Sequence, residues 1–128
     1  MEVEKIKEMY VKYSLNKSDV YKHQHYVILT RSGIEKVMAL EQINITYEVV
    51  KCEPNFAVIK ATAVKGSKVI ETFGSALKGS SFKDGSTNTW YVAEMAEKRA
   101  LSRATLKMAG LYEQSVFGED ESESFKRK

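Results

Sequence analysis

Apolar and polar residues follow two different periods along this chain, one typical of helices and one typical of strands. In 1–13, apolar residues recur at helical spacing, with acidic residues and lysines between them. In 43–51, every second position from Ile43 to Val49 is apolar or aromatic, which is the pattern of a half-buried strand. We therefore expect a short amphipathic N-terminal helix, suited to docking or subunit contact, and a strand over 43–51.

A second strand and a second helix are predicted between these two elements. The apolar run inside 21–30 is typical of a strand. The residues that follow fit a capping box, in which the Ser32 hydroxyl and the Glu35 carboxylate satisfy free backbone amides at a helix start. We expect this helix to begin at Ser32 and to end near Leu40.

Two more strand candidates, 56–64 and 68–77, come directly after 43–51. The short connections between the three segments contain Pro54 and Gly66, which are typical turn residues. The three strands are therefore expected to form an antiparallel meander.

The longest periodic segment, 90–111, predicts a helix that starts after a polar loop over 78–89. Its alanines fall within one sector of the helix, and Arg99, Arg103 and Lys107 follow each other at four-residue spacing along the flank of that sector. Small side chains let a sheet approach closely, and the basic flank is expected to stay accessible to phosphate. The same spacing is also typical of a solvated helix face.

Together these elements predict an α+β fold, with an antiparallel sheet of three to four strands packed against the long helix. The sheet and the long helix make a β-β-β-α core, preceded by the short N-terminal helix. The length of 128 residues suits one domain, which we place over 1–118. We expect 119–128 to be a flexible tail, first acidic and then basic.

Composition places the chain among globular proteins, with 43% hydrophobic and 29% charged residues. No run approaches the roughly 18 apolar residues of a membrane span, and the charged N-terminus does not resemble a signal peptide, so we expect a cytoplasmic protein without membrane association. The single cysteine, Cys52, excludes an internal disulfide framework. Residues 1–118 contain 17 basic and 13 acidic residues, a mild bias that permits nucleic-acid binding without requiring it.

Catalytic and metal-binding motifs are absent from the sequence. It contains no GxxxxGK[ST] phosphate loop, no HExxH and no cysteine pair, so we expect no enzyme activity, cofactor or metal. Glu94 is expected to pair with Lys98, and Glu97 to take part in a buried or subunit-spanning ion pair. His23 and His25 alternate on one strand and could ligate a metal, but without a third ligand we expect a structural role.

Aromatic and basic residues are interleaved near the sheet and the loop before the long helix. This mixture suits single-stranded nucleic acid, because cations neutralise phosphate while rings stack on bases. Core packing accounts for about half of the rings, most easily Phe73 and Tyr47. The candidate nucleic-acid-binding residues are Arg99, Arg103, Lys107, Lys98, Lys78, Lys83, Lys60, Trp90 and Tyr91.

From 26 to 111, the chain resembles the phage single-strand annealing proteins of the Rad-fifty-two-like fold. The segment HYVILTRSGIEKV is similar to the strand-to-helix entry of small phage members, and the meander leads to the helix AEMAEKRALSRATLKMAGL. The helix residues in places comparable with the family pattern are Ala96, Arg99, Ala100, Arg103, Ala104 and Gly110.

The resemblance implies an ATP-independent protein that binds single-stranded DNA in a groove along an oligomeric ring or arc. It implies annealing of complementary strands in recombination and repair, with Arg99, Arg103 and the lysines of the loop and sheet on the DNA backbone. The chain would be encoded by a phage or mobile element. Its acidic tail is a candidate contact for a host or phage replication or recombination protein, or a segment that competes with DNA.

Two other binding classes remain open. A double-stranded RNA-binding domain has the same α-β-β-β-α order, but it is shorter, and its second helix begins with lysines where this one begins Trp90-Tyr91-Val92. A non-enzymatic protein-interaction adaptor is the other alternative, because the acidic segment 119–125 carries an aromatic residue, as partner-recruiting tails often do.

Overall fold

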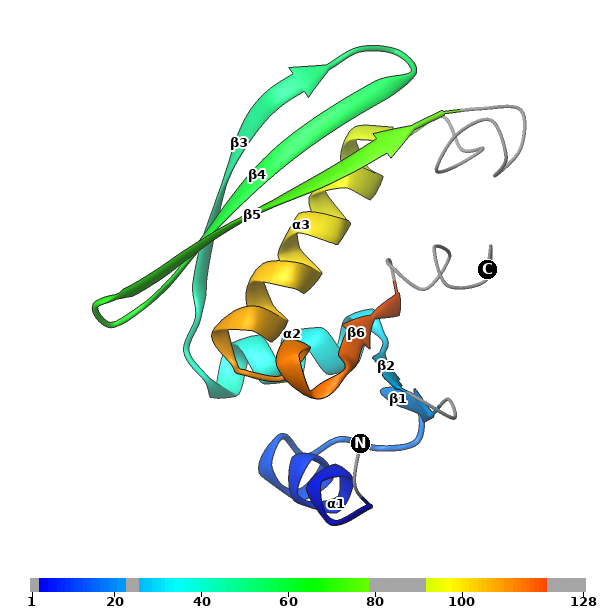
Figure 1. Cartoon of the computed structure of the whole chain (residues 1–128), viewed down its shortest axis with the longest axis vertical. Helices are drawn as coiled ribbons and strands as arrows, with labels where there is room; N and C mark the ends of the chain where they lie inside the picture. The colour runs from blue at the N-terminus through cyan, green and yellow to red at the C-terminus, as the bar shows by residue number, and fades with distance from the viewer. Residues whose placement is uncertain (1–2, 23–25, 79–91, 120–128) are drawn as a thin grey trace.

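A long helix, α3 (Val92–Met108), contacts a three-stranded sheet in each half of the molecule (Figure 1). The structure is a computed structural model that describes residues 3–22, 26–78 and 92–119. It confirms the α+β class, the long helix packed on an antiparallel meander, and the short N-terminal helix.

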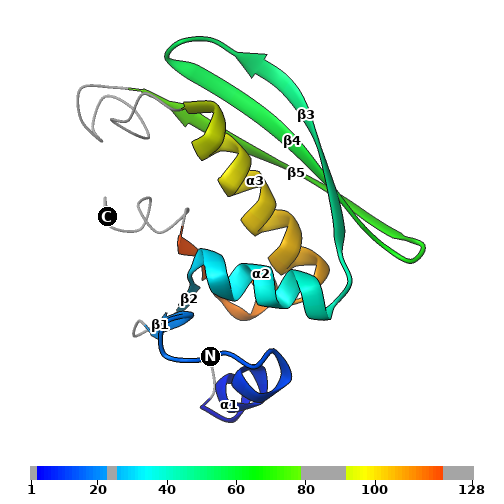
Figure 2. The ribbon, with the colours of Figure 1, turned by 180° about the vertical axis from the view of Figure 1, so that it is seen from behind.

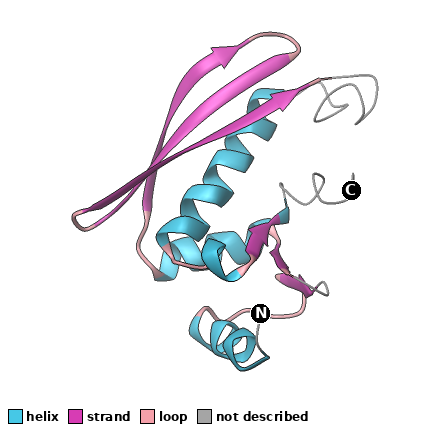
Figure 3. Cartoon of the chain, viewed as in Figure 1, coloured by secondary structure: helices cyan, strands magenta, loops and turns pink. Residues whose placement is uncertain are grey.

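The helices and strands are α1 (Val3–Lys12), β1 (Val20–Lys22), β2 (Val27–Leu29), α2 (Arg31–Leu40), β3 (Asn44–Cys52), β4 (Phe56–Lys65), β5 (Lys68–Leu77), α3, the 3-10 helix η1 (Tyr112–Gln114) and β6 (Val116–Gly118). Figure 3 shows how the helices and strands are distributed over the chain. None of the helices within the described ranges is long and apolar enough to cross a membrane.

The larger sheet has the order β3-β4-β5, and all of its pairs are antiparallel. Its inner face, toward α3, is built mainly from small side chains of the central strand: Ala57, Ala61 and Ala63 are fully buried there, together with the larger Ile59. On the next strand, Thr72 and Ala76 continue this buried row. Burial therefore alternates along β4 and β5, whereas β3, for which the alternation was predicted, is exposed along most of its length.

Helix α3 lies unusually close to β5, because both surfaces are made of small residues. A Cβ atom added at Gly74 would lie 2.1 Å from the Ala96 carbonyl oxygen and 2.5 Å from the Ala100 amide nitrogen. These distances leave no room for a side chain. Ala96, Ala100 and Ala104 are fully buried, which confirms the alanine face predicted from the sequence.

The other half of the molecule packs larger aliphatic side chains on the far side of α3. Their cluster consists of Ile6, Met9, Tyr13, Leu15, Val20, Val27, Leu29, Ile34, Val37, Leu106, Leu111 and Val116. Helix α1 contributes Ile6, Met9 and Tyr13, so its apolar face is covered by the same chain. Figure 2 shows α2 in this half, beside the C-terminal end of α3.

The strand predicted over 21–30 is two strands, and they belong to a second sheet. Here β1 and β2 pair antiparallel, and β6 pairs with β2 in parallel, giving the order β1-β2-β6. Strand β6, which lies directly before the proposed tail, is not predicted by any pattern in the sequence.

The helix start predicted at Ser32 is wrong by two residues. The N-cap is Thr30, whose side chain accepts a hydrogen bond from the Gly33 amide at 3.4 Å. The Ser32 hydroxyl instead donates to the buried Asp19 carboxylate at 2.5 Å, and Glu35 pairs with Arg31 at 3.0 Å. Both side chains of the expected capping box are therefore used elsewhere.

Two carboxylates link the elements of the N-terminal half through hydrogen bonds. The first is Asp19, which is 1% exposed. It accepts hydrogen bonds from the Lys36 ammonium at 2.6 Å, the Ser32 hydroxyl at 2.5 Å and the Asn16 amide at 3.0 Å. Burial acts to raise the pKa of Asp19, but these donors outweigh it and the net pKa is lowered.

The second carboxylate is Glu41, at the C-terminal end of α2. It accepts hydrogen bonds from the Lys65 ammonium at 2.6 Å and from the Tyr13 hydroxyl at 2.5 Å, and the Lys12 ammonium lies 3.2 Å away. The bonds from Lys65 and Tyr13 lower the pKa of Glu41 to about 2. This carboxylate links α1 and α2 to the end of β4.

Candidate nucleic-acid interface

The two arginines of the predicted basic stripe contact the backbone of β5. The Arg99 guanidinium donates to the Ser75 carbonyl at 2.7 Å, and that of Arg103 donates to the Phe73 carbonyl at 2.9 Å. Strand β5 is at the edge of the sheet, and its alternate carbonyls, including these two, face away from β4. The arginines therefore cap acceptors that the sheet leaves unpaired.

The spacing of the two elements explains why both contacts form. Arginines four residues apart on a helix are separated by about 6.0 Å along its axis. Carbonyls two residues apart on a strand are separated by about 6.8 Å. The prediction that the basic flank stays accessible is wrong for Arg99, which is 8% exposed, while Arg103 is half-buried. Whether either arginine also contacts phosphate stays a prediction.

The remaining lysine candidates do not share one surface. Lys60 lies on the face of the sheet opposite α3, and Lys78 lies at the end of β5. Lys98 is exposed on the side of α3 away from the alanine face. Lys107, in the last turn of α3, lies 5.3 Å from the centre of the Tyr112 ring, a cation–π contact.

Three of the candidate site residues lie outside the described residues, namely Lys83, Trp90 and Tyr91. The same holds for His23 and His25. Within the described ranges, no group of three or more His, Cys, Asp or Glu side chains could hold a metal ion.

The outer face of the β3-β4-β5 sheet, opposite α3, brings a ring and a cation together. Phe73 is 51% exposed and lies directly opposite Lys60, which in turn lies opposite Glu48. The Phe73 carbonyl points to the open edge, so Phe73 and Lys60 form a non-hydrogen-bonded pair, the kind whose side chains approach most closely. Along β5, the exposed Val69 and Leu77 flank Phe73 on the same face.

Acidic neighbours share the Lys60 ammonium. It bonds Glu71 at 2.8 Å, and this bond together with the charge of Glu48 raises the pKa of Lys60. The outer face therefore presents an apolar and aromatic track beside lysines, Lys60 and Lys51, that are paired with acidic residues. Such a surface favours stacking over phosphate contact.

Tyr47 is the second exposed ring of this sheet, and it lies on the inner face. Helix α3 packs mainly on β4 and β5, which leaves Tyr47 42% exposed and Val49 62% exposed along β3. Burial of the ring and the nearby Glu97 carboxylate raise the pKa of Tyr47, while Arg31 acts to lower it. Glu97 is exposed, so the buried ion pair expected for it within the chain is wrong.

Sequence reasoning assigned Phe73 and Tyr47 to the core, and both are exposed. One signal in the sequence identifies the orientation of Phe73. Thr72, Gly74 and Ala76 are the small residues that match an alanine-lined helix, so the residue between Thr72 and Gly74 must face the other way. The exposure of Tyr47 has no such signal, since it depends on which strands α3 covers.

The start of the proposed tail contacts β1. The Tyr21 hydroxyl on β1 donates to the Glu119 carboxylate at 3.0 Å. The rest of the segment, 120–128, lies outside the described residues.

Comparisons with protein families, with curated proteins and with solved structures give no match for this chain.

Proposed function

We propose that the protein binds single-stranded DNA on the outer face of the β3-β4-β5 sheet and promotes annealing of complementary strands without nucleotide hydrolysis. The observation that carries this proposal is the exposed Phe73 ring, paired with Lys60 on a face that none of the described helices covers. Unpaired bases expose π-faces that stack on such a ring, whereas the bases of a duplex are already stacked.

The shape of this face suits a linear ligand. Val69, Phe73 and Leu77 recur every four residues along β5, with exposed fractions of 57%, 51% and 43%. They form a track that follows the strand, with Glu71 and Ser75 between them on the same face. Lys60, beside the central ring, would contact a phosphate while the ring stacks on a base.

The remaining parts of the proposal follow from the resemblance to the phage annealing proteins. The protein would act in the cytoplasm as a homo-oligomer, as a ring or an arc that aligns several tracks, and it would have no catalytic residues. Its acidic tail would recruit a replication or recombination protein. The lack of a phosphate loop in the sequence supports an ATP-independent activity.

An adaptor that binds another protein is the second candidate function. The exposed Val69 and Leu77 favour it, because apolar side chains gathered on one face also suit a protein partner. Both candidates use the same outer face, so nucleic-acid titrations separate them.

The test is a fluorescence anisotropy titration of a labelled single-stranded oligonucleotide at two salt concentrations. Because binding neutralises few phosphates, we expect an affinity that falls with salt along a shallow slope. Glu71→Gln should strengthen binding, since it releases the Lys60 ammonium, and Lys60→Ala should weaken it. Mixing complementary strands with a quencher pair then measures annealing.

Two results would contradict the proposal. Tight binding to duplex RNA without binding to single strands would favour the double-stranded RNA-binding class. Failure to bind any nucleic acid would favour the adaptor.

A further inference from the structure

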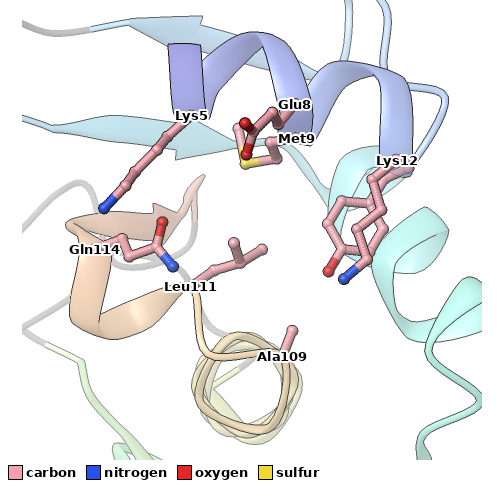
Figure 4. A pocket seen from close by; sticks show the side chains of 8 residues that line it. Lys5, Glu8, Met9, Lys12, Ala109, Leu111 and Gln114 are labelled. Atoms are coloured by element: carbon pink, nitrogen blue, oxygen red, sulfur yellow. The ribbon is translucent and has the colours of Figure 1, made fainter. Parts of the chain in front are cut away.

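A pocket of about 220 Å³ lies between α1 and the segment that follows α3, away from the larger sheet (Figure 4). It is lined by Lys5, Glu8, Met9, Lys12, Tyr13, Ala109, Leu111 and Gln114. Ligand sites for drug-sized molecules are larger, roughly 300–1,000 Å³. The pocket is therefore suited to a small metabolite.

The floor of the pocket is apolar. Met9 is 3% exposed and Leu111 is 7% exposed, and the short side chain of Ala109 leaves the space between them unfilled. The Tyr13 hydroxyl donates its proton to Glu41, so Tyr13 has no donor left for a ligand in the pocket. An apolar body placed here would lose water without leaving a polar floor group unsatisfied.

The rim of the pocket offers both charges. Lys5 and Glu8 come from α1, and neither has a hydrogen bond or ion pair with any described residue (Figure 4). Across from them, the Gln114 amide nitrogen donates to the Gly110 carbonyl at 3.2 Å, which leaves the Gln114 amide oxygen as an acceptor. Lys12 is different, because its ammonium already pairs with Glu41.

These groups select one class of ligand. A simple anion would be repelled by the Glu8 carboxylate, and a purely apolar molecule would gain nothing from the exposed rim charges. A molecule with a carboxylate for Lys5, an ammonium for Glu8 and Gln114, and an apolar body for Met9 and Leu111 satisfies all of them. We propose that this pocket binds a free α-amino acid with an apolar side chain.

Such a ligand would bridge α1 to the end of α3, because its two charged ends and its side chain contact both segments. Binding to the folded state alone raises the unfolding temperature with ligand concentration. The pocket and the outer face of the sheet share no residue, so occupancy of the pocket is independent of the DNA-binding proposal.

The first test measures thermal unfolding and isothermal titration of the full chain with L-leucine. We expect leucine to raise the unfolding midpoint by several degrees at saturation. Isocaproate lacks the ammonium and isoamylamine lacks the carboxylate, so both should bind at least about tenfold more weakly than leucine.

The second test uses variants of exposed side chains, which should leave the fold intact. Lys5→Gln and Glu8→Gln should each weaken leucine binding at least about tenfold. Lys7→Gln is the matched control, because Lys7 is exposed on the same helix and does not line the pocket. Three results would overturn the proposal: no leucine binding, isocaproate binding as tightly as leucine, or a Lys7→Gln effect as large as that of Lys5→Gln.

Discussion

The two halves of this molecule pack on the same helix with side chains of different size. The β3-β4-β5 sheet meets α3 through alanine and glycine, with Gly74 against the backbone of Ala96 and Ala100. The N-terminal half meets it through leucine, isoleucine and valine, and its elements are joined by ion pairs of the buried Asp19 and the partly buried Glu41. The first half should therefore be sensitive to added volume, and the second to protonation.

Adding a methyl group at Gly74 should have the largest effect. Gly74→Ala places a Cβ atom against backbone atoms of α3, which cannot rotate away, so helix and sheet must separate. We expect a loss of about 3 kcal/mol in the free energy of unfolding, at the upper end for overpacking. Ser75→Ala is the control, because the exposed Ser75 contributes its backbone carbonyl to Arg99 and not its hydroxyl. Urea denaturation measures both variants, and equal stability of the two would contradict the close approach.

Acid should destabilise the N-terminal half in particular. The folded state lowers the pKa of both Asp19 and Glu41, so unfolded chains bind protons more readily. The stability that these carboxylates contribute is complete above their unfolded pKa values. For Glu41 it is lost as the pH falls from about 4.5 to about 2.

Hydrogen exchange followed by mass spectrometry against pH tests this expectation. Protection in α1 and α2 should fall before protection in β4 and β5 as the pH is lowered.

Asp19→Asn should lower the free energy of unfolding by about 2 kcal/mol at neutral pH, because it removes the charge that three donors surround. It should also make stability less dependent on pH. An acid transition that opens the larger sheet first would contradict the comparison.

A smaller loss of stability is expected when the contact of Arg99 with the edge of β5 is removed. Arg99→Ala should reduce stability by about 1.5 kcal/mol, because it removes a charged donor from the Ser75 carbonyl. Lys98→Ala, at an exposed neighbouring position, should change stability by less than about 0.5 kcal/mol. Urea midpoints measure both variants. If the two variants are equally stable, the contact of Arg99 with β5 has no structural role.

The sequence predicted the elements whose pattern is local. The strand over 43–51 and the alanine sector of the long helix are visible without knowledge of any partner, and both are present in the structure. The half-buried character predicted for 43–51 is wrong, because Tyr47 and Val49 are exposed. Strand β6 could not be predicted, because three residues carry no periodic signal and the partner, β2, lies far away in the sequence.

The candidate site depended more on tertiary structure than the fold did. The arginine spacing was visible, but the role of Arg99 follows from a carbonyl 24 residues earlier, on a strand edge that only the sheet order defines. The N-cap predicted at Ser32 is wrong for a similar reason, because the Ser32 hydroxyl donates a hydrogen bond to the buried Asp19, which lies outside the helix. Non-local partners therefore decided which side chains stay available for binding.

The most direct test of the proposed function compares the two exposed rings of the larger sheet. Phe73 and Tyr47 have similar exposed fractions, 51% and 42%, but lie on opposite faces. Removing a stacking ring costs about 1–3 kcal/mol per base. In a titration with labelled single-stranded DNA, Phe73→Ala should therefore weaken binding at least about fivefold, while Tyr47→Ala leaves it unchanged. Equal losses in the two variants, or a loss confined to Tyr47→Ala, would contradict binding on the outer face.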